Sequence, residues 1–208
     1  MKKNIIIGAG GHARAAWSCI NTLKNTKVDG FIDIDFKGVA EKIFGIDVIG
    51  GLEALDKFRT PDINIYLAIG DNHKRKDIYL LLKDRKYNMP NLIHPTAAIC
   101  SSVLIGEANF IGPFAHIGPS VVVGNANIIN TFANIEHQAS VANFVHCAPG
   151  SLICGRSQIS DEVFVGANST IIENLKISHG TKIGAGAVIQ KNIVEKDQTF
   201  IGIPGKKI

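Results

Sequence analysis

The chain has 208 residues, 46% of them hydrophobic, which is enough for a buried core and one further small domain. The formal net charge is +4, and this excess lies in the first 92 residues, because residues 93–208 carry seven basic and seven acidic side chains. So mild a charge excludes a nucleic-acid-binding surface but suits a phosphorylated small molecule, and the lack of a long apolar run predicts no signal peptide and no membrane insertion.

The N-terminal part predicts a small Rossmann-like α/β domain over residues 1–90. A short buried strand is followed by the turn Gly8-Ala9-Gly10-Gly11-His12-Ala13 and then by an apolar-periodic helix, which is the order strand, glycine turn, helix. Two more strands and a second helix complete one βαβαβ unit. The predicted elements are a strand at Asn4–Ile7, a helix from Arg14 to Leu23, strands at Val28–Ile34 and Ile63–Ile69, and a helix from His73 to Lys86.

The glycine turn has the spacing G-x-G-x-x-[GA] of dinucleotide-binding folds. Asp33 or Asp35, at the end of the second strand, stands where such a fold places its acidic residue. A dinucleotide needs two βαβαβ halves, however, and only one fits before residue 93. A mononucleotide or a nucleotide sugar is therefore the better-sized ligand.

Residues near the strand ends are the candidate ligand contacts. We assign Gly8 a structural role in the tight turn. A helix N-terminus binds phosphate, and His12 in its neutral form could donate a hydrogen bond to a phosphate or ribose. The predicted nucleotide-sugar site consists of Gly10, Gly11, His12, Asp33, Asp35 and Asn72.

From Ile93 onward the chain repeats every six residues without an insertion. The first position of each hexad is aliphatic except at Cys147, and a small or apolar residue such as Ala97 or Val103 follows four residues later in most hexads. This period indicates a β-solenoid with three short strands per coil. We predict a parallel β-helix over residues 91–208, with first positions Ile93, Ile99, Ile105, Ile111, Ile117, Val123, Ile129, Ile135, Val141, Cys147, Ile153, Ile159, Val165, Ile171, Ile177, Ile183 and Ile189.

At the position four residues after the aliphatic one, two hexads have an asparagine in place of a small or apolar residue. Asn109 and Asn127 are eighteen residues apart, which is one coil, so we expect them to stack and form a hydrogen-bonded ladder. The four cysteines show no CxxC spacing, and two of them lie within the hexad pattern as small core residues. A reducing, cytoplasmic location follows as the simplest interpretation.

The combined motifs resemble one known family over nearly the whole chain. The glycine turn, the Phe31–Asp35 and Ala68–Asn72 segments, Leu92–Pro95 and the hexads are together similar to the sialic-acid O-acetyltransferase and nucleotide-aminosugar N-acetyltransferase family. The resemblance implies a homotrimer in which a Rossmann-like domain precedes a left-handed β-helix. It also implies transfer of an acetyl group from acetyl-CoA to a sugar.

The family's catalytic motif is a hydrophobic residue, any residue, a histidine and an acidic residue, and Ile135-Glu136-His137-Gln138 matches it except at the last position. The resemblance makes His137 the general base, a role that suits imidazole because it titrates near neutral pH. Gln138 can accept a hydrogen bond from the ring but cannot stabilise an imidazolium by charge. The weaker base that results suits an amine better than a hydroxyl, and Glu136 is the alternative orienting group, although alternation directs it to the other side.

A second histidine of the family, matched here by His146, lies near the acyl donor. His137 and His146 are nine residues apart, half a coil, so they point from different parts of the cross-section. We expect them to meet across a subunit interface, one from each protomer, and the low charge of the solenoid favours such burial. The spacing of the histidines supplies no pair of nearby ligands, so we predict no metal site.

The C-terminal residues Phe200–Lys207 resemble the Gly-x-Pro-Ala-Lys tail of hexapeptide acyltransferases, with Gly205 in place of Ala. Such tails lie beside coenzyme A, so Lys206 is a candidate contact for its phosphates. Small residues at the corners of the coils could leave room for the pantetheine arm of coenzyme A. The predicted acetyl-CoA contacts are His146, Gly155, Ala167, Ala185 and Lys206.

These features predict an acetyl-CoA-dependent N-acetyltransferase. Its substrate would be the 4-amino group of a nucleotide-linked 4-amino-4,6-dideoxy sugar, with dTDP as the favoured nucleotide, in surface polysaccharide (O-antigen) biosynthesis. One alternative is O-acetylation of a sialic acid or related sugar, which would need no nucleotide pocket. An alternative of another class is a non-catalytic trimeric scaffold that binds a nucleotide sugar, which Gln138 in place of an acid keeps open.

Overall fold

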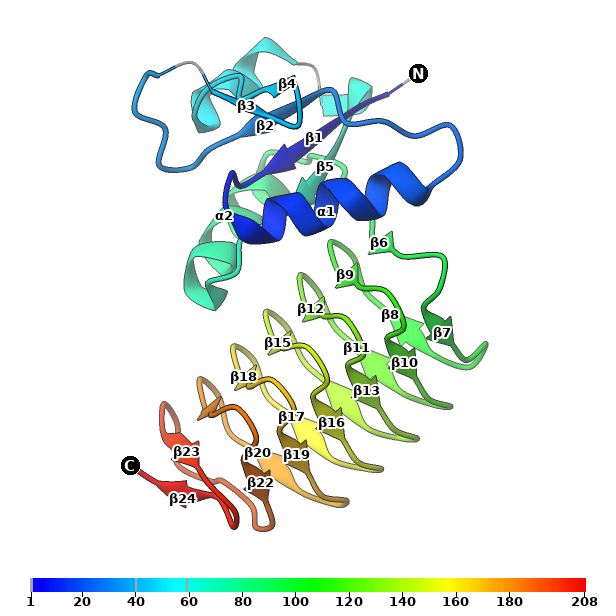
Figure 1. Ribbon diagram of the computed structural model, residues 1–208, viewed down its shortest axis with the longest axis vertical. Coiled ribbons are helices and arrows are strands. Elements are labelled where there is room, and N and C mark those ends of the chain that lie inside the picture. The colour runs from blue at the N-terminus through cyan, green and yellow to red at the C-terminus, as the bar shows by residue number, and fades with distance from the viewer. Residues whose placement is uncertain (1, 40, 59) are drawn as a thin grey trace.

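A three-stranded parallel sheet with one helix on each side forms the N-terminal part of the molecule (Figure 1). In the computed structural model, which describes residues 2–39, 41–58 and 60–208, the strand order is β2-β1-β5. The elements are β1 (Lys3–Ile7), α1 (Gly11–Thr22), β2 (Gly30–Ile32), β5 (Ile63–Leu67) and α2 (Asn72–Asp84). All five expected elements are present; β1 begins one residue earlier than predicted, β2 and β5 are shorter, and the helices begin one to three residues earlier.

Alternation along β1 explains why both faces of the sheet are covered. Ile5 and Ile7 lie in one core cluster with Leu82 of α2, whereas Ile6 lies in a second cluster with Ala16 of α1. Successive side chains of a strand point to opposite faces, so a continuous run of isoleucines requires a helix on each side.

A βαβαβ unit would have a helix between β2 and β5, but the predicted elements leave this connection unassigned. It contains an antiparallel hairpin, β3 (Lys42–Ile43) and β4 (Ile46–Asp47), and two 3₁₀ turns, Leu52–Lys57 and Thr60–Asp62. Within the described residues 33–39, 41–58 and 60–62 there is no α-helix. Glycines at 38, 45, 50 and 51 and a proline at 61 break this stretch into pieces too short for a helical period.

The solenoid predicted from the hexads is confirmed, and its strands form three sheets, named here by their first strand, which are parallel except for the antiparallel pair β23–β24 (Figure 1). The β6 face contains β6 (Leu92–Ile93), β9 (Phe110–Ile111), β12 (Ile128–Ile129), β15 (His146–Cys147), β18 (Phe164–Val165), β21 (Lys182–Ile183), β23 (Thr199–Ile201) and β24 (Lys206–Lys207). The β7 face contains β7 (Ala98–Ile99), β10 (His116–Ile117), β13 (Asn134–Ile135), β16 (Leu152–Ile153), β19 (Thr170–Ile171) and β22 (Val188–Ile189). The β8 face contains β8 (Leu104–Ile105), β11 (Val122–Val123), β14 (Ser140–Val141), β17 (Gln158–Ile159) and β20 (Lys176–Ile177).

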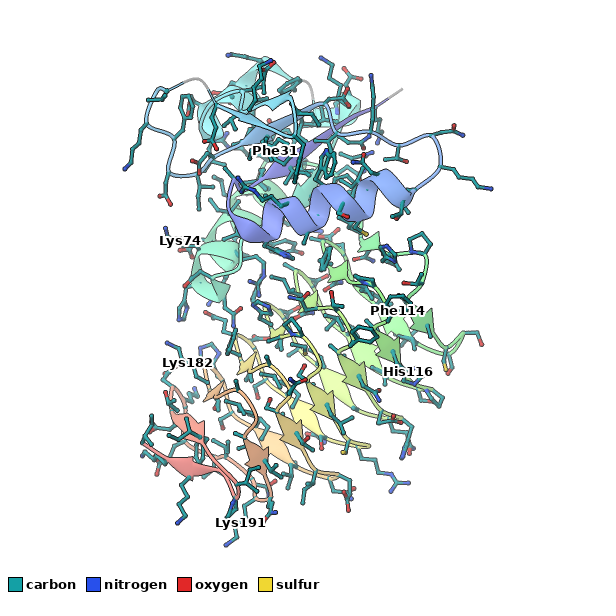
Figure 2. All side chains as sticks on the ribbon, in the orientation of Figure 1. Phe31, Lys74, Phe114, His116, Lys182 and Lys191 are labelled. Atoms are coloured by element: carbon teal, nitrogen blue, oxygen red, sulfur yellow. The ribbon has the colours of Figure 1, made fainter. Side chains whose placement is uncertain are left out.

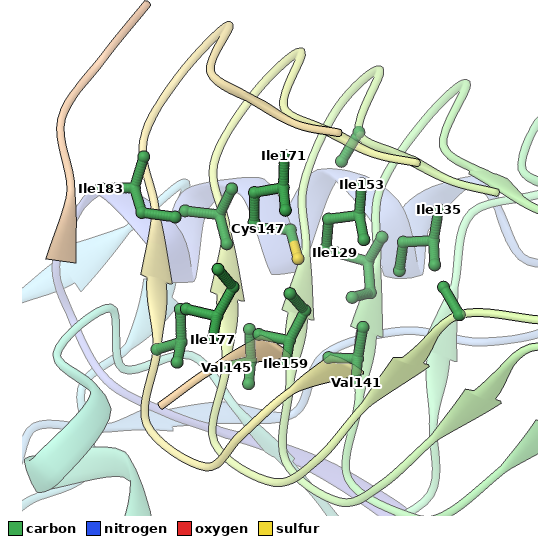
Figure 3. Close-up of a cluster of buried hydrophobic side chains, with 14 of the residues drawn as sticks. Ile129, Ile135, Val141, Val145, Cys147, Ile153, Ile159, Ile171, Ile177 and Ile183 are labelled. Carbon is green, nitrogen blue, oxygen red and sulfur yellow. The ribbon is translucent and has the colours of Figure 1, made fainter. Parts of the chain in front are cut away.

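The aliphatic hexad positions fill the interior of the solenoid. Figure 3 shows them in rows, with Cys147 taking the place of one isoleucine. Neighbouring coils pair eighteen residues apart, as Ile117 does with Ile135 and Ile135 with Ile153. Three residues after most of the aliphatic positions the backbone adopts a positive φ, as at Gln138 (58°) and Arg156 (61°), which turns the chain at each corner.

The predicted asparagine ladder is confirmed, and it is longer than expected. Asn109 Oδ1 accepts from the backbone N–H of Asn127 at 2.8 Å, Asn91 Oδ1 bonds the N–H of Asn109, and Asn127 Oδ1 bonds the N–H of Val145. A second ladder runs beside it through Asn125, Asn143 and Asp161. Both ladders lie in the turns from the β8 face to the β6 face (residues 106–109, 124–127, 142–145 and 160–163), which we call the docking corner.

The N-terminal part packs on the docking corner and the β6 face. The cluster behind α2 includes Ala126 and Phe144 of the docking corner, and the cluster around α1 includes Phe110 and Ile128 of the β6 face. Figure 1 shows α1 lying between the sheet and the first coils. Each core cluster of the N-terminal part thus extends across residue 90 into the solenoid, which holds the two parts together.

Candidate functional site

The carboxyl ends of β1, β2 and β5 surround a cavity of about 200 Å³. Among its lining residues are Gly10, Asp33 and Asp35, which the sequence assigned to a ligand site, together with Gly70 and Lys74. Carboxyl ends of parallel strands meet at one edge of a sheet, so this placement follows from the topology. Gly10 leaves open space at the start of α1, where a phosphate could approach the backbone.

Gly8 has the structural role expected of it. Its φ is +122°, and a Cβ atom there would lie 2.4 Å from the carbonyl oxygen of Ala68. Only glycine permits this close approach of β1 to β5.

Charged groups of both signs rim this first cavity. Lys74 Nζ donates to Asp35 Oδ2 at 3.1 Å, and Asp33 Oδ1 accepts from the backbone N–H of Asp35 at 3.1 Å. Lys74 was not predicted as a site residue. Figure 2 shows it at the same edge of the molecule as Lys182 of the solenoid, opposite Phe114 and His116.

His12 turns away from the open end of α1 and into the molecule. Its ring packs edge-on against Phe110, with centroids 4.8 Å apart, and its Nε2 atom is buried without a hydrogen-bond partner. Burial, followed by the charges of His146 and Arg75, lowers the pKa of His12 to about 3. The ring is therefore neutral near pH 7, as the sequence analysis supposed, but it faces the solenoid instead of the first cavity.

His146 lies beneath the loop that joins β5 to α2. Its Nδ1 atom is 3.3 Å from the carbonyl oxygen of Gly70, and its ring meets Phe164 edge-on at 5.1 Å. Burial and the charge of Arg75 lower the pKa of His146 to about 4, although the bond to Gly70 opposes the shift. A carbonyl only accepts, so the proton of the neutral ring sits on Nδ1, and the buried, unpartnered Nε2 presents a lone pair.

A second cavity, of about 290 Å³, adjoins the first at Gly70. It lies between the start of α2 and the solenoid, and its lining residues are Gly70, Asp71, Asn72, His73, Glu162, Phe164, Gly180 and Lys182. Phe164 both lines this cavity and contacts His146. Gly70 and Phe164 therefore connect the strand ends of the sheet to the histidine of the β6 face.

Glu162 is the buried acid of the second cavity. Its side chain is 1% exposed and pairs with His73 and with Lys76, whose Nζ lies 2.5 Å away. Burial raises the pKa of Glu162, but the hydrogen bond and charge of Lys76, with the charges of His73 and His179, outweigh this and hold the pKa below its usual value. The carboxylate is thus fixed in its ionised form at the wall of the cavity.

Asn72, expected to contact the ligand, directs its amide to the solenoid. The amide nitrogen donates to the carbonyl of Glu162 at 2.9 Å, and the amide oxygen accepts from Arg75 at 2.7 Å. These bonds give the Asn72 side chain a part in docking α2 onto the solenoid.

Arg75 is the main polar link between the two parts, and the sequence analysis did not single it out. It is 1% exposed. Its guanidinium donates to the carbonyls of Ala126 and Phe144 at the docking corner, at 2.8 Å each, and to those of Ile69 and Gly70 at 3.0 and 3.1 Å. A planar fork with five N–H donors suits such a ring of carbonyls.

His137 and Gln138 lie elsewhere, at the corner after β13 of the β7 face. His137 is exposed within the protomer, and its Nδ1 lies 3.3 Å from Gln138 Oε1. Glu136, the alternative orienting group, instead accepts from the side chain of Asn134 at 3.1 Å. His137 and His146 are on different faces, as the nine-residue spacing predicted.

Apart from His146, the predicted acetyl-CoA contacts border the β7 face or the end of the solenoid. Gly155 lies beside the His137 ring, where a Cβ atom would come within 2.6 Å of it. Ala167 and Ala185 lie in successive turns from the β6 to the β7 face, and Lys206 lines a cavity of about 520 Å³ beside the C-terminal hairpin. Of the described residues, those that line this cavity do not include His146, which lies beneath the loop that joins β5 to α2.

Residues 3–82 match the model of the PglD N-terminal domain. The chain is 32% identical over 112 residues to UDP-N-acetylbacillosamine N-acetyltransferase of Bacillus subtilis (strain 168), an alignment that covers 51% of this chain and 50% of that enzyme. The chain thus matches about half the length of this relative.

Two solved structures extend the match to the whole chain. A mutant of GDP-perosamine N-acetyltransferase from Caulobacter crescentus, in complex with CoA and GDP-perosamine, is 27% identical with a TM-score of 0.94, over 100% of this chain and 97% of the other. The acetyltransferase domain of PglB from Neisseria gonorrhoeae, in complex with acetyl coenzyme A, is 27% identical with a TM-score of 0.92, over 100% and 99%. Residues 3–82 thus match the PglD N-terminal domain, and the whole chain shares the fold of these two acetyltransferases.

The chain has the two expected parts, an N-terminal domain that matches the PglD N-terminal domain and a hexapeptide β-helix. None of its helices, within the residues described, is long and apolar enough to cross a membrane. The same residues hold no group of three or more His, Cys, Asp or Glu side chains arranged to bind a metal ion. The four cysteines, all in the described part, are free thiols.

Proposed function

We propose that this chain is a sugar N-acetyltransferase that transfers an acetyl group from acetyl-CoA to the 4-amino group of a nucleotide-linked 4-amino-4,6-dideoxy sugar. The observation that carries the proposal is the position of Gly70. This residue borders the strand-end cavity, borders the second cavity, and accepts the hydrogen bond of His146. A nucleotide held at the strand ends would place its sugar beside the β6 face.

The relatives favour a nucleotide-linked amine over a free sugar acid. Both GDP-perosamine N-acetyltransferase and UDP-N-acetylbacillosamine N-acetyltransferase are named for nucleotide-linked amino sugars. A free sialic acid would leave the strand-end cavity and its Asp35–Lys74 pair unused. We favour dTDP as the nucleotide, whereas these relatives are named for UDP and GDP, so all three belong in the test.

We place the active site between two protomers of a homotrimer, with His137 from one and His146 from its neighbour. The exposure of His137 and its distance from the α2 side of the same chain support this arrangement. Acetyl-CoA would lie along the β7 face, where Gly155, Ala167 and Ala185 border the path and Lys206 stands near its end. The free thiols and the supply of both substrates fit a cytoplasmic reaction in polysaccharide biosynthesis.

The chemistry needs one proton acceptor. The amine attacks the thioester carbonyl, His137 Nε2 takes a proton from the attacking nitrogen, and the tetrahedral intermediate expels the CoA thiolate, which recovers that proton. His146 cannot donate through Nε2, so it accepts a hydrogen bond from an N–H or O–H of the substrates. Direct attack needs no covalent enzyme intermediate.

The test is turnover of the purified protein with acetyl-CoA and a panel of dTDP-, UDP- and GDP-linked 4-amino sugars, with free sialic acid as the comparison. Release of CoA with one nucleotide-linked amine, and a product heavier by one acetyl group, is expected. Turnover of sialic acid alone would favour the O-acetyltransferase.

His137→Ala separates the enzyme from a nucleotide-sugar-binding scaffold. Loss of a general base should lower kcat by roughly two to four orders of magnitude, while the nucleotide sugar still binds. Binding without turnover in the unmodified protein across the whole panel would contradict the enzymatic proposal.

A further inference from the structure

The coil that follows His137 and Gln138 supports them residue by residue. Eighteen positions on, Gly155 lies against His137 and Arg156 lies against Gln138. The backbone N–H of Arg156 donates to the carbonyl of His137 at 3.0 Å, which fixes the two turns relative to each other. Gln138 and Arg156 also share the same left-handed backbone conformation, so their side chains leave successive corners in parallel.

Arg156 determines which end of the Gln138 amide faces the histidine. Its Nε atom lies 3.1 Å from Gln138 Oε1. A guanidinium only donates hydrogen bonds, so the atom it faces must be the amide oxygen and not the amide nitrogen. The same oxygen lies 3.3 Å from His137 Nδ1. Because an amide oxygen only accepts, Nδ1 must carry the ring proton, and Nε2 is left with the lone pair that a base needs.

The family's acidic residue at this position would not need such help. A carboxylate presents an oxygen in either orientation, but an amide turned by half a rotation presents its NH₂ group to the ring. That NH₂ would bond a lone pair on Nδ1 and move the proton to Nε2, where it would block proton abstraction from the substrate.

We propose that Arg156 is a positioning residue that holds Gln138 in one amide orientation and thereby sets the tautomer of His137. The proposal deepens the function given above, because it rests on His137 as the general base. It also explains how the chain uses Gln where the family has an acid. Gln138, which replaces the family's acid, is bonded by the hydrogen-bond donor Arg156 one coil away.

The kinetic test compares the effect of Arg156→Met in two backgrounds. In the natural Gln138 background we expect kcat to fall by about tenfold with little change in KM, since one hydrogen bond to a charged donor selects the amide orientation. In the Gln138→Glu background the same change should have little effect on kcat. Arg156→Lys should keep most of the activity, and Lys176→Met, which removes one positive charge from the β8 face, should be neutral.

An equal loss of kcat in both backgrounds would overturn the proposal, because Arg156 would then act by another route. A loss in the Lys176→Met control as large as in Arg156→Met would do the same, since it would reflect overall charge.

A second measurement does not depend on activity. Nitrogen-15 NMR of the histidine rings distinguishes the two neutral tautomers, and the spectrum of His137→Ala identifies the His137 signals. We expect Nδ1–H in the unmodified protein and a shift toward Nε2–H in Arg156→Met, but not when Gln138→Glu is also present. A tautomer unchanged by Arg156→Met would refute the role of Arg156, even in an active enzyme. The expected shift in a protein without acetyltransferase activity would support that role while refuting the proposed function.

Discussion

His146 and Gly70 are joined across 76 residues of sequence by a hydrogen bond of 3.3 Å from the imidazole Nδ1 to the backbone carbonyl. The bond ties the β6 face of the solenoid to the loop that starts α2. Arg75 donates to the same carbonyl, so a full positive charge lies beside the ring. Burial above all, together with this charge, keeps both His146 and its neighbour His12 neutral in the folded protein at neutral pH.

These two histidines should make the protein sensitive to acid. Their folded pKa values, about 3 for His12 and about 4 for His146, are below the value of 6.5 expected in the unfolded chain. The unfolded chain therefore binds more protons below about pH 6.5, and stability that is complete above this pH is lost as the pH falls. We expect the free energy of unfolding to fall by about 2 to 3 kcal/mol for each pH unit in this range.

Urea denaturation at about pH 7.5, 6.5 and 5.5 measures this fall. His146→Gln removes one of the two groups and should reduce the slope below pH 6.5 by about half. A free energy of unfolding that stays constant between neutral pH and about pH 5.5 would show that the two rings are not held neutral.

Arg75→Met should destabilise the docking of α2 on the solenoid. The change leaves the carbonyls of Ala126 and Phe144 buried without their donor, and each unsatisfied group costs about 1 to 3 kcal/mol. We expect a loss of at least about 3 kcal/mol in the free energy of unfolding by urea. Arg75→Lys should not restore it, because an ammonium cannot reach the separate carbonyls that the planar fork bonds.

Arg85→Met is the matched control for this measurement. Arg85 Nη1 lies 3.5 Å from Asp56 Oδ1, and both side chains are exposed. The change should therefore cost less than about 1 kcal/mol in the free energy of unfolding. Similar losses for the two variants would mean that Arg75 contributes no more than a surface charge.

Gly155→Ala should impair catalysis without unfolding the protein. The new Cβ would lie 2.6 Å from the Cε1 and Nε2 atoms of His137, so the ring must move. The ring is exposed and free to turn aside, and Gly155 does not have a positive φ, so the cost in stability should be small. A displaced base should lower kcat by about ten- to a hundredfold.

Thermal unfolding of the same Gly155→Ala preparation provides the control. An unchanged midpoint with reduced kcat is the expected pair of results. Full activity would show that His137 does not work from the position it has in the structure.

The solenoid was predictable from the sequence because each coil repeats the same local pattern and pairs with the coil before it. Asn109 and Asn127 could be placed one above the other for the same reason. The hairpin β3–β4 was missed, because two-residue strands separated only by Phe44 and Gly45 leave no period to detect.

The candidate site was predictable only where the topology determines it. Gly10, Asp33 and Asp35 meet because parallel strands end at one edge. Arg75, Glu162 and Phe164 could not be found, since their contacts join segments up to 90 residues apart and depend on how the N-terminal part docks. The inward turn of His12 has the same origin, because the first turn of a helix has two sides and only packing selects between them.

The side-chain ladders of the docking corner end at Val145 and Asp161, and the polar contacts of α2 reach no further than Glu162 and Val163. The first coils are thus clamped by a domain and by two ladders, whereas the last coils rely mainly on main-chain pairing and the aliphatic core. Stability should therefore decrease along the solenoid from its first coil to its last. The coils that leave the ribosome first are held most firmly, and each later coil forms on a finished edge. Under heat or mechanical tension the coils should unfold in the reverse order, beginning at the C-terminal hairpin.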